Sequence, residues 1–136
     1  MKFTNGSINN PGEFTFTNNI EIPNQGEAYK GKLIVLVNEL SQSQAEYTAM
    51  AFRAGNNTTI IGSTTAGADG NASTIMLPGG LRTMISGIGV YYPNEEETQR
   101  AGIVPDIEVK PTIEGIRKGK DELIEKAIEI ILSERL

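Results

Sequence analysis

Two apolar segments and the helix-forming segment between them predict an α/β domain. Residues 33–37 read Leu-Ile-Val-Leu-Val, and five aliphatic residues in a row are typical of a strand that is buried on both faces. Residues 44–54 contain no Gly or Pro and include four Ala, one Met and one Phe, which favours a helix, and residues 58–61 read as a second strand. A strand, a helix and a strand in this order form a β-α-β unit with parallel neighbouring strands.

The first 31 residues are expected to form a turn-rich lead-in with short strands, followed by the main unit over residues 32–136. Residues 13–17 alternate between polar and apolar side chains, as a short strand or hairpin arm does. Residues 9–12 read Asn-Asn-Pro-Gly, which favours a turn. We expect an ordinary turn there, because no apolar strand precedes it.

A loop of small residues, 62–70, follows the second strand of the unit. It is therefore expected at the carboxyl edge of the sheet, on the same side as the start of the helix. Glycine in such a loop lets a ligand approach the backbone, although a tight turn alone also requires it. Residues 72–77 and 81–91 are predicted to pair as a hairpin. The three glutamates at 95–97 are expected to be solvated rather than metal-binding.

The last helix is predicted to begin at about residue 120. Its sequence places apolar side chains at the spacing of one helical stripe, which consists of Leu123, Ile124, Ala127, Ile128 and Ile131. We expect this stripe to pack in the core or against a partner. Assembly into a homo-oligomer through this helix is one of the alternatives that the sequence leaves open.

The composition excludes several classes of function. The formal net charge of −5 argues against nucleic-acid binding, which needs clustered Lys and Arg. The chain contains no Cys and no His, which excludes disulfides, a thiol nucleophile and the usual zinc sites. No apolar run approaches the roughly 18 residues that span a bilayer, and the first residues carry no signal-like segment.

A serine stands where the first strand of the unit gives way to the helix. Ser43 precedes Glu46 by three positions, which is the pattern of a capping box that stabilises a helix start by about 1 kcal/mol. The same position lies at the carboxyl edge of the sheet, where helix amides and the helix dipole stabilise a developing oxyanion. The local pattern alone favours the cap over a nucleophile.

The residues around this serine resemble the nucleophile segment of the carboxyl-terminal processing, or tail-specific, serine peptidases. Residues 38–46 read Asn-Glu-Leu-Ser-Gln-Ser-Gln-Ala-Glu. The family nucleophile lies three residues before a glutamate, which selects Ser43 over Ser41. Further matches follow in family order at residues 60–67, 90–93 and 102–109 and in the final helix. The resemblance covers residues 29–132.

This resemblance implies a ClpP/crotonase-like fold of stacked β-β-α units, and it makes residues 32–136 the carboxyl-terminal part of a peptidase catalytic domain. The chain differs from the family in two ways that affect the catalytic chemistry. The lysine that serves as the base in the bacterial branch is replaced by Ala68, and the chain has no histidine, which is the base in the tricorn and retinoid-binding branch. We therefore expect a partial domain, inactive alone, whose base lies upstream in a longer protein.

The resemblance also assigns roles to individual residues. It implies that Ser43 is the nucleophile and that the backbone amide of Gln44 is one oxyanion donor. By position, Gln99 is the counterpart of a residue that orients the nucleophile, although it is often a glutamate in the family and a solvated loop glutamine is the other interpretation. The loop with Gly62, Thr65 and Gly67 is expected to line the substrate groove. Neither a metal nor a cofactor is implied.

The leading hypothesis is thus a serine endopeptidase domain that acts on a polypeptide and needs the amino-terminal part of the same protein. The alternative is a non-catalytic domain that binds a peptide or a lipid on the same scaffold, because Ala68 and the missing histidine remove both known bases. The resemblance implies a periplasmic or cell-envelope location. The sequence itself does not indicate a compartment.

Overall fold

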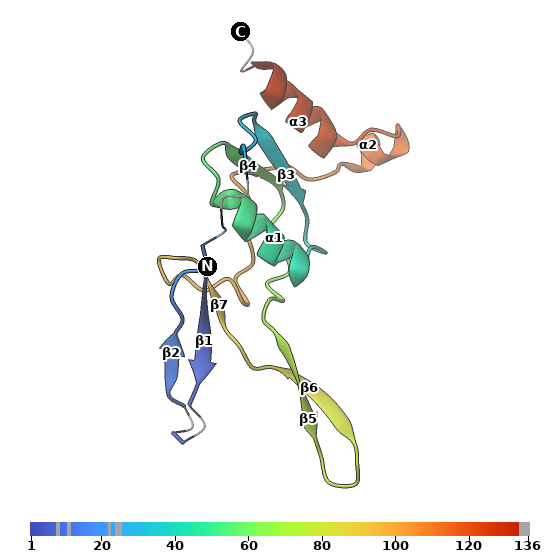
Figure 1. Ribbon diagram of the computed structural model, residues 1–136. Helices are drawn as coiled ribbons and strands as arrows, with labels where there is room; N and C mark the ends of the chain where they lie inside the picture. The colour runs from blue at the N-terminus through green and yellow to red at the C-terminus, as the bar shows by residue number, and fades with distance from the viewer. Residues whose placement is uncertain (8, 11, 22, 24–25, 134–136) are drawn as a thin grey trace.

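The structure, a computed structural model, describes residues 1–7, 9–10, 12–21, 23 and 26–133 (Figure 1). It is a mixed α/β fold, as predicted. The strands are β1 (Lys2–Gly6), β2 (Phe14–Phe16), β3 (Leu33–Val37), β4 (Thr58–Gly62), β5 (Ala72–Met76), β6 (Arg82–Ser86), β7 (Val90–Tyr91) and β8 (Ile107–Glu108). The helices are α1 (Gln44–Arg53), α2 (Ile113–Arg117) and α3 (Glu122–Ser133).

The predicted β-α-β unit is confirmed. Strands β3 and β4 are parallel and pair from Leu33 opposite Thr58 to Val37 opposite Gly62, with α1 between them in the chain. Strand β8 adds to the other side of β4, also in parallel. The core lies between this sheet and α1 and contains Val37, Ala49, Met50, Ile60, Val90 and Ile103.

Strand β3 is less buried than its sequence predicts. Within it only Val37 is buried, and Leu36 is 41% exposed. The reason is that β3 forms an edge of the three-stranded sheet β3-β4-β8, whereas the central strand β4 carries the fully buried Ile60 and Ile61. An uninterrupted aliphatic run does not by itself distinguish an edge strand from a central one.

A second sheet has the order β2-β1-β7 and brings the start of the chain against residues 90–91. Strand β1 was not predicted. It pairs with β2 in an antiparallel hairpin, closed by a hydrogen bond from Ser7 N to Glu13 O of 3.0 Å. The predicted turn at 9–12 falls within this hairpin, and its described residues are 9, 10 and 12; the position of residue 11 lies outside the described part.

The predicted hairpin exists, but the prediction for its second arm was wrong. Strand β6 ends at Ser86, and β7 leaves the hairpin to pair with Lys2 and Phe3 of β1. Thr4 holds the segment before β7 beside β1, since its amide donates to Gly89 O at 3.1 Å and its hydroxyl accepts from Gly89 N at 2.9 Å. Pairing with β1, which is distant in the sequence, therefore ends the pairing between the two arms of the hairpin.

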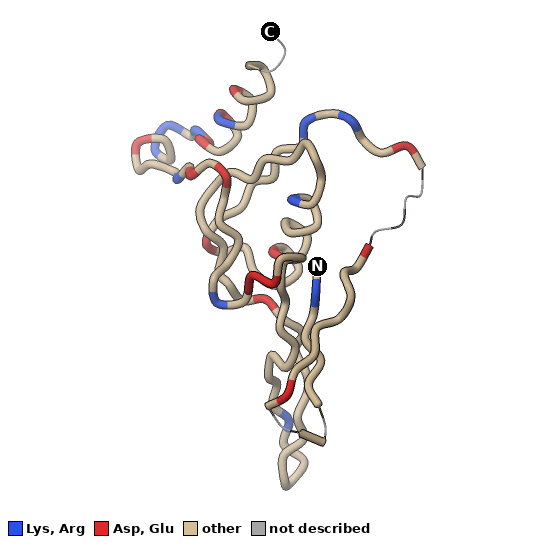
Figure 2. Tube along the Cα trace, turned by 90° about the vertical axis from the view of Figure 1, so that its left-hand side faces the viewer, with Lys and Arg blue, Asp and Glu red and all other residues tan. Residues whose placement is uncertain are grey.

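The β5–β6 hairpin projects away from the rest of the molecule (Figure 1). All of its strand residues are exposed, and Met76, Leu81 and Met84 are each more than half exposed. Figure 2 shows the projection as almost uncharged, and Arg82 is its one charged residue. It presents an exposed and largely apolar surface.

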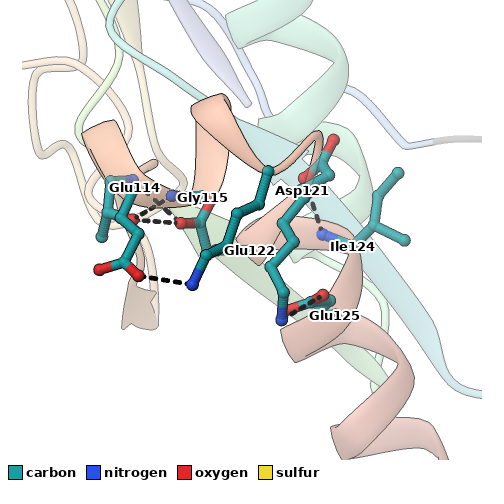
Figure 3. Close-up of polar contacts among 9 residues, drawn as sticks. Glu114, Gly115, Asp121, Glu122, Ile124 and Glu125 are labelled. Carbon is teal, nitrogen blue, oxygen red and sulfur yellow. Dashed lines mark hydrogen bonds and ion pairs between the residues drawn. The ribbon is translucent and has the colours of Figure 1, made fainter.

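The carboxyl-terminal helices are joined by a small polar network (Figure 3). Thr112 caps α2 by accepting from Gly115 N at 2.9 Å. Its own amide and hydroxyl donate to Glu122 Oε1 at the start of α3, at 3.1 and 2.7 Å. The last helix was predicted correctly, whereas the five-residue α2 was missed. Within the described chain, no helix is long and apolar enough to cross a membrane.

The apolar stripe predicted for α3 is only partly covered. The helix packs near β3 and β4; Leu123, Ala127 and Ile131 are half-buried, whereas Ile124 and Ile128 are about half exposed. The described part of the chain therefore leaves one side of the stripe about half exposed.

Candidate functional site

Ser43 stands in a strained turn between β3 and α1. Its φ of 53° and ψ of −119° lie in a region that residues other than glycine rarely adopt, at a cost of about 1–3 kcal/mol. An ordinary N-cap residue has extended backbone angles instead. A strained turn between a strand and a helix also exposes the nucleophilic serine in unrelated hydrolases. The Ser43 side chain is exposed.

The turn is held on both sides. The Ser43 amide donates to Ala68 O at 3.1 Å and to Glu46 Oε2 at 3.0 Å. Ser43 and Glu46 thus face each other as in a capping box, but the Ser43 hydroxyl lacks the geometry of a full cap hydrogen bond. The capping interpretation is therefore compatible with the structure, but it does not account for the positive φ.

Glu46 does more than cap the helix. Its side chain is fully buried, and Oε1 accepts from the Thr65 hydroxyl at 2.5 Å and from Gly67 N at 2.8 Å. The carboxylate thereby joins the start of α1 to the loop after β4. Charged hydrogen bonds of this kind are about twice as strong as neutral ones. The local sequence pattern did not reveal this second connection.

The three loop residues expected to line a substrate groove are all buried. A Cβ on Gly62 would lie 1.7 Å from Val37 O, so glycine is required for the approach of β4 to β3. The Thr65 hydroxyl also accepts from Ile103 N at 2.7 Å, and Gly67 O accepts from Arg100 N at 2.6 Å. These residues position the loop beside Ser43, and their direct contact with a substrate stays a prediction.

A pocket of about 370 Å³ opens beside Ser43. Strand β1, the start of α1, the loop after β4 and the segment leading into β7 contribute to its wall. The lining residues are Phe3, Asn5, Thr17, Ser43, Gln44, Tyr47, Asp69, Gly70, Asn71, Ile88 and Val90. Ser43 and Gln44, which are consecutive in the chain, therefore both lie on a pocket of the size that holds small ligands, and their roles as nucleophile and oxyanion donor stay predictions.

Gln44 is the first residue of α1, so its amide has no partner within the helix. No hydrogen bond described for the chain uses this N–H as a donor. Gln99 is half-buried, and its side-chain amide lies against Gly70. It does not line the pocket, and its role as an orienting residue stays a prediction.

Asp69 is a pocket residue to which the sequence assigned no role. It is 6% exposed, its Oδ1 accepts from Gly70 N at 2.8 Å, and its buried Oδ2 has no hydrogen-bond partner among the described residues. Burial raises the pKa of the Asp69 carboxyl, the Gly70 amide opposes this shift, and the negative charge of Glu46 adds to it. An acidic residue within an otherwise uncharged loop of small residues was the available signal.

Asp69→Asn is expected to raise the free energy of unfolding at neutral pH and to change it little at about pH 3. The Asp69 carboxyl stays protonated to a higher pH in the folded protein than in the unfolded chain. The free energy of unfolding therefore falls as the pH rises from the pKa of this carboxyl in the unfolded chain through its pKa in the folded protein. Urea unfolding at both pH values measures the difference. The exposed variant Glu96→Gln is the control; an equal change in both variants would contradict the prediction.

In the part of the chain that the structure describes, no group of three His, Cys, Asp or Glu side chains is arranged to hold a metal ion. Ala68, at the position of the family lysine, contributes its backbone carbonyl to the Ser43 turn and is exposed. Tyr47 and Asp69 are the titratable side chains that line the pocket with Ser43.

Comparisons with known proteins agree with this arrangement. A putative peptidase from Parabacteroides merdae ATCC 43184 superposes with a TM-score of 0.80 at 29% identity, over 96% of this chain and 42% of that one. Mature CPAF complexed with lactacystin shares the fold with a TM-score of 0.70 at 24% identity, over 81% of this chain and 22% of that one. The chain thus spans less than half the length of either structure.

The photosystem II D1 C-terminal processing protease is a further similar structure, with a TM-score of 0.50 at 25% identity over 59% of this chain and 21% of that one. None of the curated proteins matches the chain. The family model named Peptidase family S41 matches residues 4–109, which include α1, strands β2 to β8 and every pocket-lining residue except Phe3. The chain therefore belongs to peptidase family S41.

Proposed function

We propose that the complete protein is a serine endopeptidase in which Ser43 attacks a peptide carbonyl. The observation that carries this proposal is the strained conformation of Ser43 at the start of α1, on the wall of a pocket. Strain of this kind costs stability, and it gathers at functional sites where a side chain must be held in an otherwise unfavourable position.

The surroundings of Ser43 supply part of the required chemistry. The free Gln44 amide and the positive end of the α1 dipole stabilise the negative charge that develops on the carbonyl oxygen. A serine hydroxyl also needs a base to remove its proton. Since the sequence has no histidine and position 68 is alanine, this base is proposed to come from an upstream part of the protein.

The proposed substrate is a polypeptide. A polypeptide can enter in an extended conformation and pair its backbone with an open strand, while one side chain fills a pocket. The pocket beside Ser43 is of suitable size for one such side chain. A carboxyl-terminal processing activity is the finer form of the same proposal.

A non-catalytic peptide- or lipid-binding domain is the second candidate. Two observations favour it. Ala68 replaces the lysine that is the base in one branch of the family, and the sequence has no histidine, which is the base in the other branch. Its pocket wall includes the apolar side chains of Phe3, Ile88 and Val90, which also suit an apolar ligand.

Labelling with a fluorophosphonate probe distinguishes the two candidates, because the probe reacts with an activated serine. We expect the complete protein to be labelled, Ser43→Ala to lose the label, and Ser41→Ala to keep it. Intact-protein mass spectrometry measures the adduct. Absence of the adduct from complete protein that circular dichroism shows to be folded would favour the binding domain.

A further inference from the structure

The wall of the pocket beside Ser43 includes Asp69, whose carboxyl oxygen Oδ2 has no hydrogen-bond partner among the described residues. We propose that this pocket binds the side chain of a lysine or arginine of the polypeptide, next to the bond that Ser43 attacks, and that Asp69 selects for it. This inference rests on the proposed function and names the substrate class of the same site.

The first step is the closeness of Asp69 to the reacting group. Ser43 N is hydrogen-bonded to the carbonyl oxygen of Ala68, the residue directly before Asp69, at 3.1 Å. Both Ser43 and Asp69 line the same pocket. One substrate residue can therefore present its carbonyl to Ser43 while its side chain enters the pocket toward Asp69.

The second step is the chemistry of the walls. Phe3 and Tyr47 are stacked, with ring centroids 6.0 Å apart and an interplanar angle of 11°, and Ile88 and Val90 add apolar surface. Long basic side chains bury their methylene stems against apolar surface, and their charged ends are attracted to aromatic faces. A pocket that combines apolar and aromatic side chains with uncharged polar ones and a single acidic group fits such a side chain.

The third step is the missing partner of Asp69. Its Oδ2 is buried and meets no donor in the described part of the chain, and none of the ion pairs described there includes this residue. A buried carboxylate without a counter-charge is unfavourable. An ammonium or guanidinium group that enters the pocket supplies both the donor and the positive charge, so binding energy depends on that group.

Two other roles for Asp69 give different results in an experiment. If the residue only supports the loop, its replacement lowers the turnover of every substrate equally. If it orients an upstream base, its replacement again affects all substrates and also shifts the pH profile. Only a residue that recognises the substrate side chain changes the ratio between basic and uncharged substrates.

The test uses the complete protein and two peptides that differ only in lysine or norleucine before the cleaved bond. We expect kcat/KM to favour lysine about a hundredfold. Asp69→Asn should remove this preference by lowering kcat/KM for the lysine peptide while leaving the norleucine peptide within about threefold. Glu96→Gln, exposed and absent from the pocket wall, should keep the preference.

An acetyl-lysine peptide repeats the test without changing the protein, so its result does not depend on how Asp69→Asn affects folding. Because acetylation removes the charge, we expect a loss similar to that of norleucine. Equal turnover of all three peptides by the unaltered protein would overturn the inference while leaving the proposed peptidase function intact.

If none of the peptides is cleaved, the proposed peptidase function fails and binding becomes the measurement. Fluorescence anisotropy of labelled peptides with the complete protein then tests the pocket directly. A preference for lysine that Asp69→Asn removes would still support the inference. Equal affinity for the lysine and norleucine peptides would overturn it as well.

Discussion

Replacement of Ser43 by alanine in the complete protein is expected to lower peptide turnover by about a millionfold. The hydroxyl is the group that forms the covalent bond with the substrate, and nothing else on the pocket wall can replace it, since the other hydroxyls there belong to Thr17 and Tyr47 and neither begins a helix. The loss should appear in kcat, with the protein still folded. Turnover of a peptide under single-turnover conditions measures it.

Ser41→Ala is the matched control for this prediction. The Ser41 hydroxyl accepts from Asn38 N at 3.1 Å and contacts Asn38 Oδ1 at 3.3 Å, so it stabilises the turn after β3. Its loss should lower the free energy of unfolding by about 1 kcal/mol and leave kcat within a few fold. If Ser41→Ala lost turnover and Ser43→Ala kept it, the assignment of the nucleophile would be wrong.

Glu46→Ala is expected to lower the free energy of unfolding by about 4 kcal/mol. The change removes the acceptor of two buried donors, the Thr65 hydroxyl and Gly67 N, and one of the two acceptors of Ser43 N, which keeps Ala68 O. Each buried donor left without an acceptor costs about 1–3 kcal/mol. Urea unfolding followed by circular dichroism measures the difference.

The control for Glu46→Ala is Glu129→Ala in α3. Glu129 is exposed and forms a hydrogen bond of 2.8 Å with Lys126, a surface pair of small energy. We expect a change within about 0.5 kcal/mol. A small effect at position 46 as well would show that the loop after β4 does not depend on the buried carboxylate.

The sequence predicted the elements whose signal is local. Strands β3 and β4 and helix α1 each carry their own apolar pattern, and the order of the three was sufficient to infer parallel pairing. Strand β1 was missed because Lys-Phe-Thr-Asn-Gly contains one large apolar residue, and it becomes a strand only through partners at both sides. The end of β6 was misplaced because Thr4, far away in the sequence, bonds to Gly89.

The same distinction holds for the candidate site. The position of Ser43 followed from a strand, a turn and a helix in sequence order. The pocket did not, because its walls come from β1 and the segment before β7, which meet only through tertiary pairing. The importance of Asp69 depends on its burial, and burial in a loop of small residues has no periodic signature in a sequence.

The strained backbone of Ser43 also affects how this chain would respond to selection. Glycine adopts a positive φ without strain, and at a helix start it is only slightly worse than serine. A directed-evolution library selected for thermal stability alone would therefore favour glycine at position 43 and discard the hydroxyl. Selection for stability and selection for activity thus act in opposite directions on this one codon.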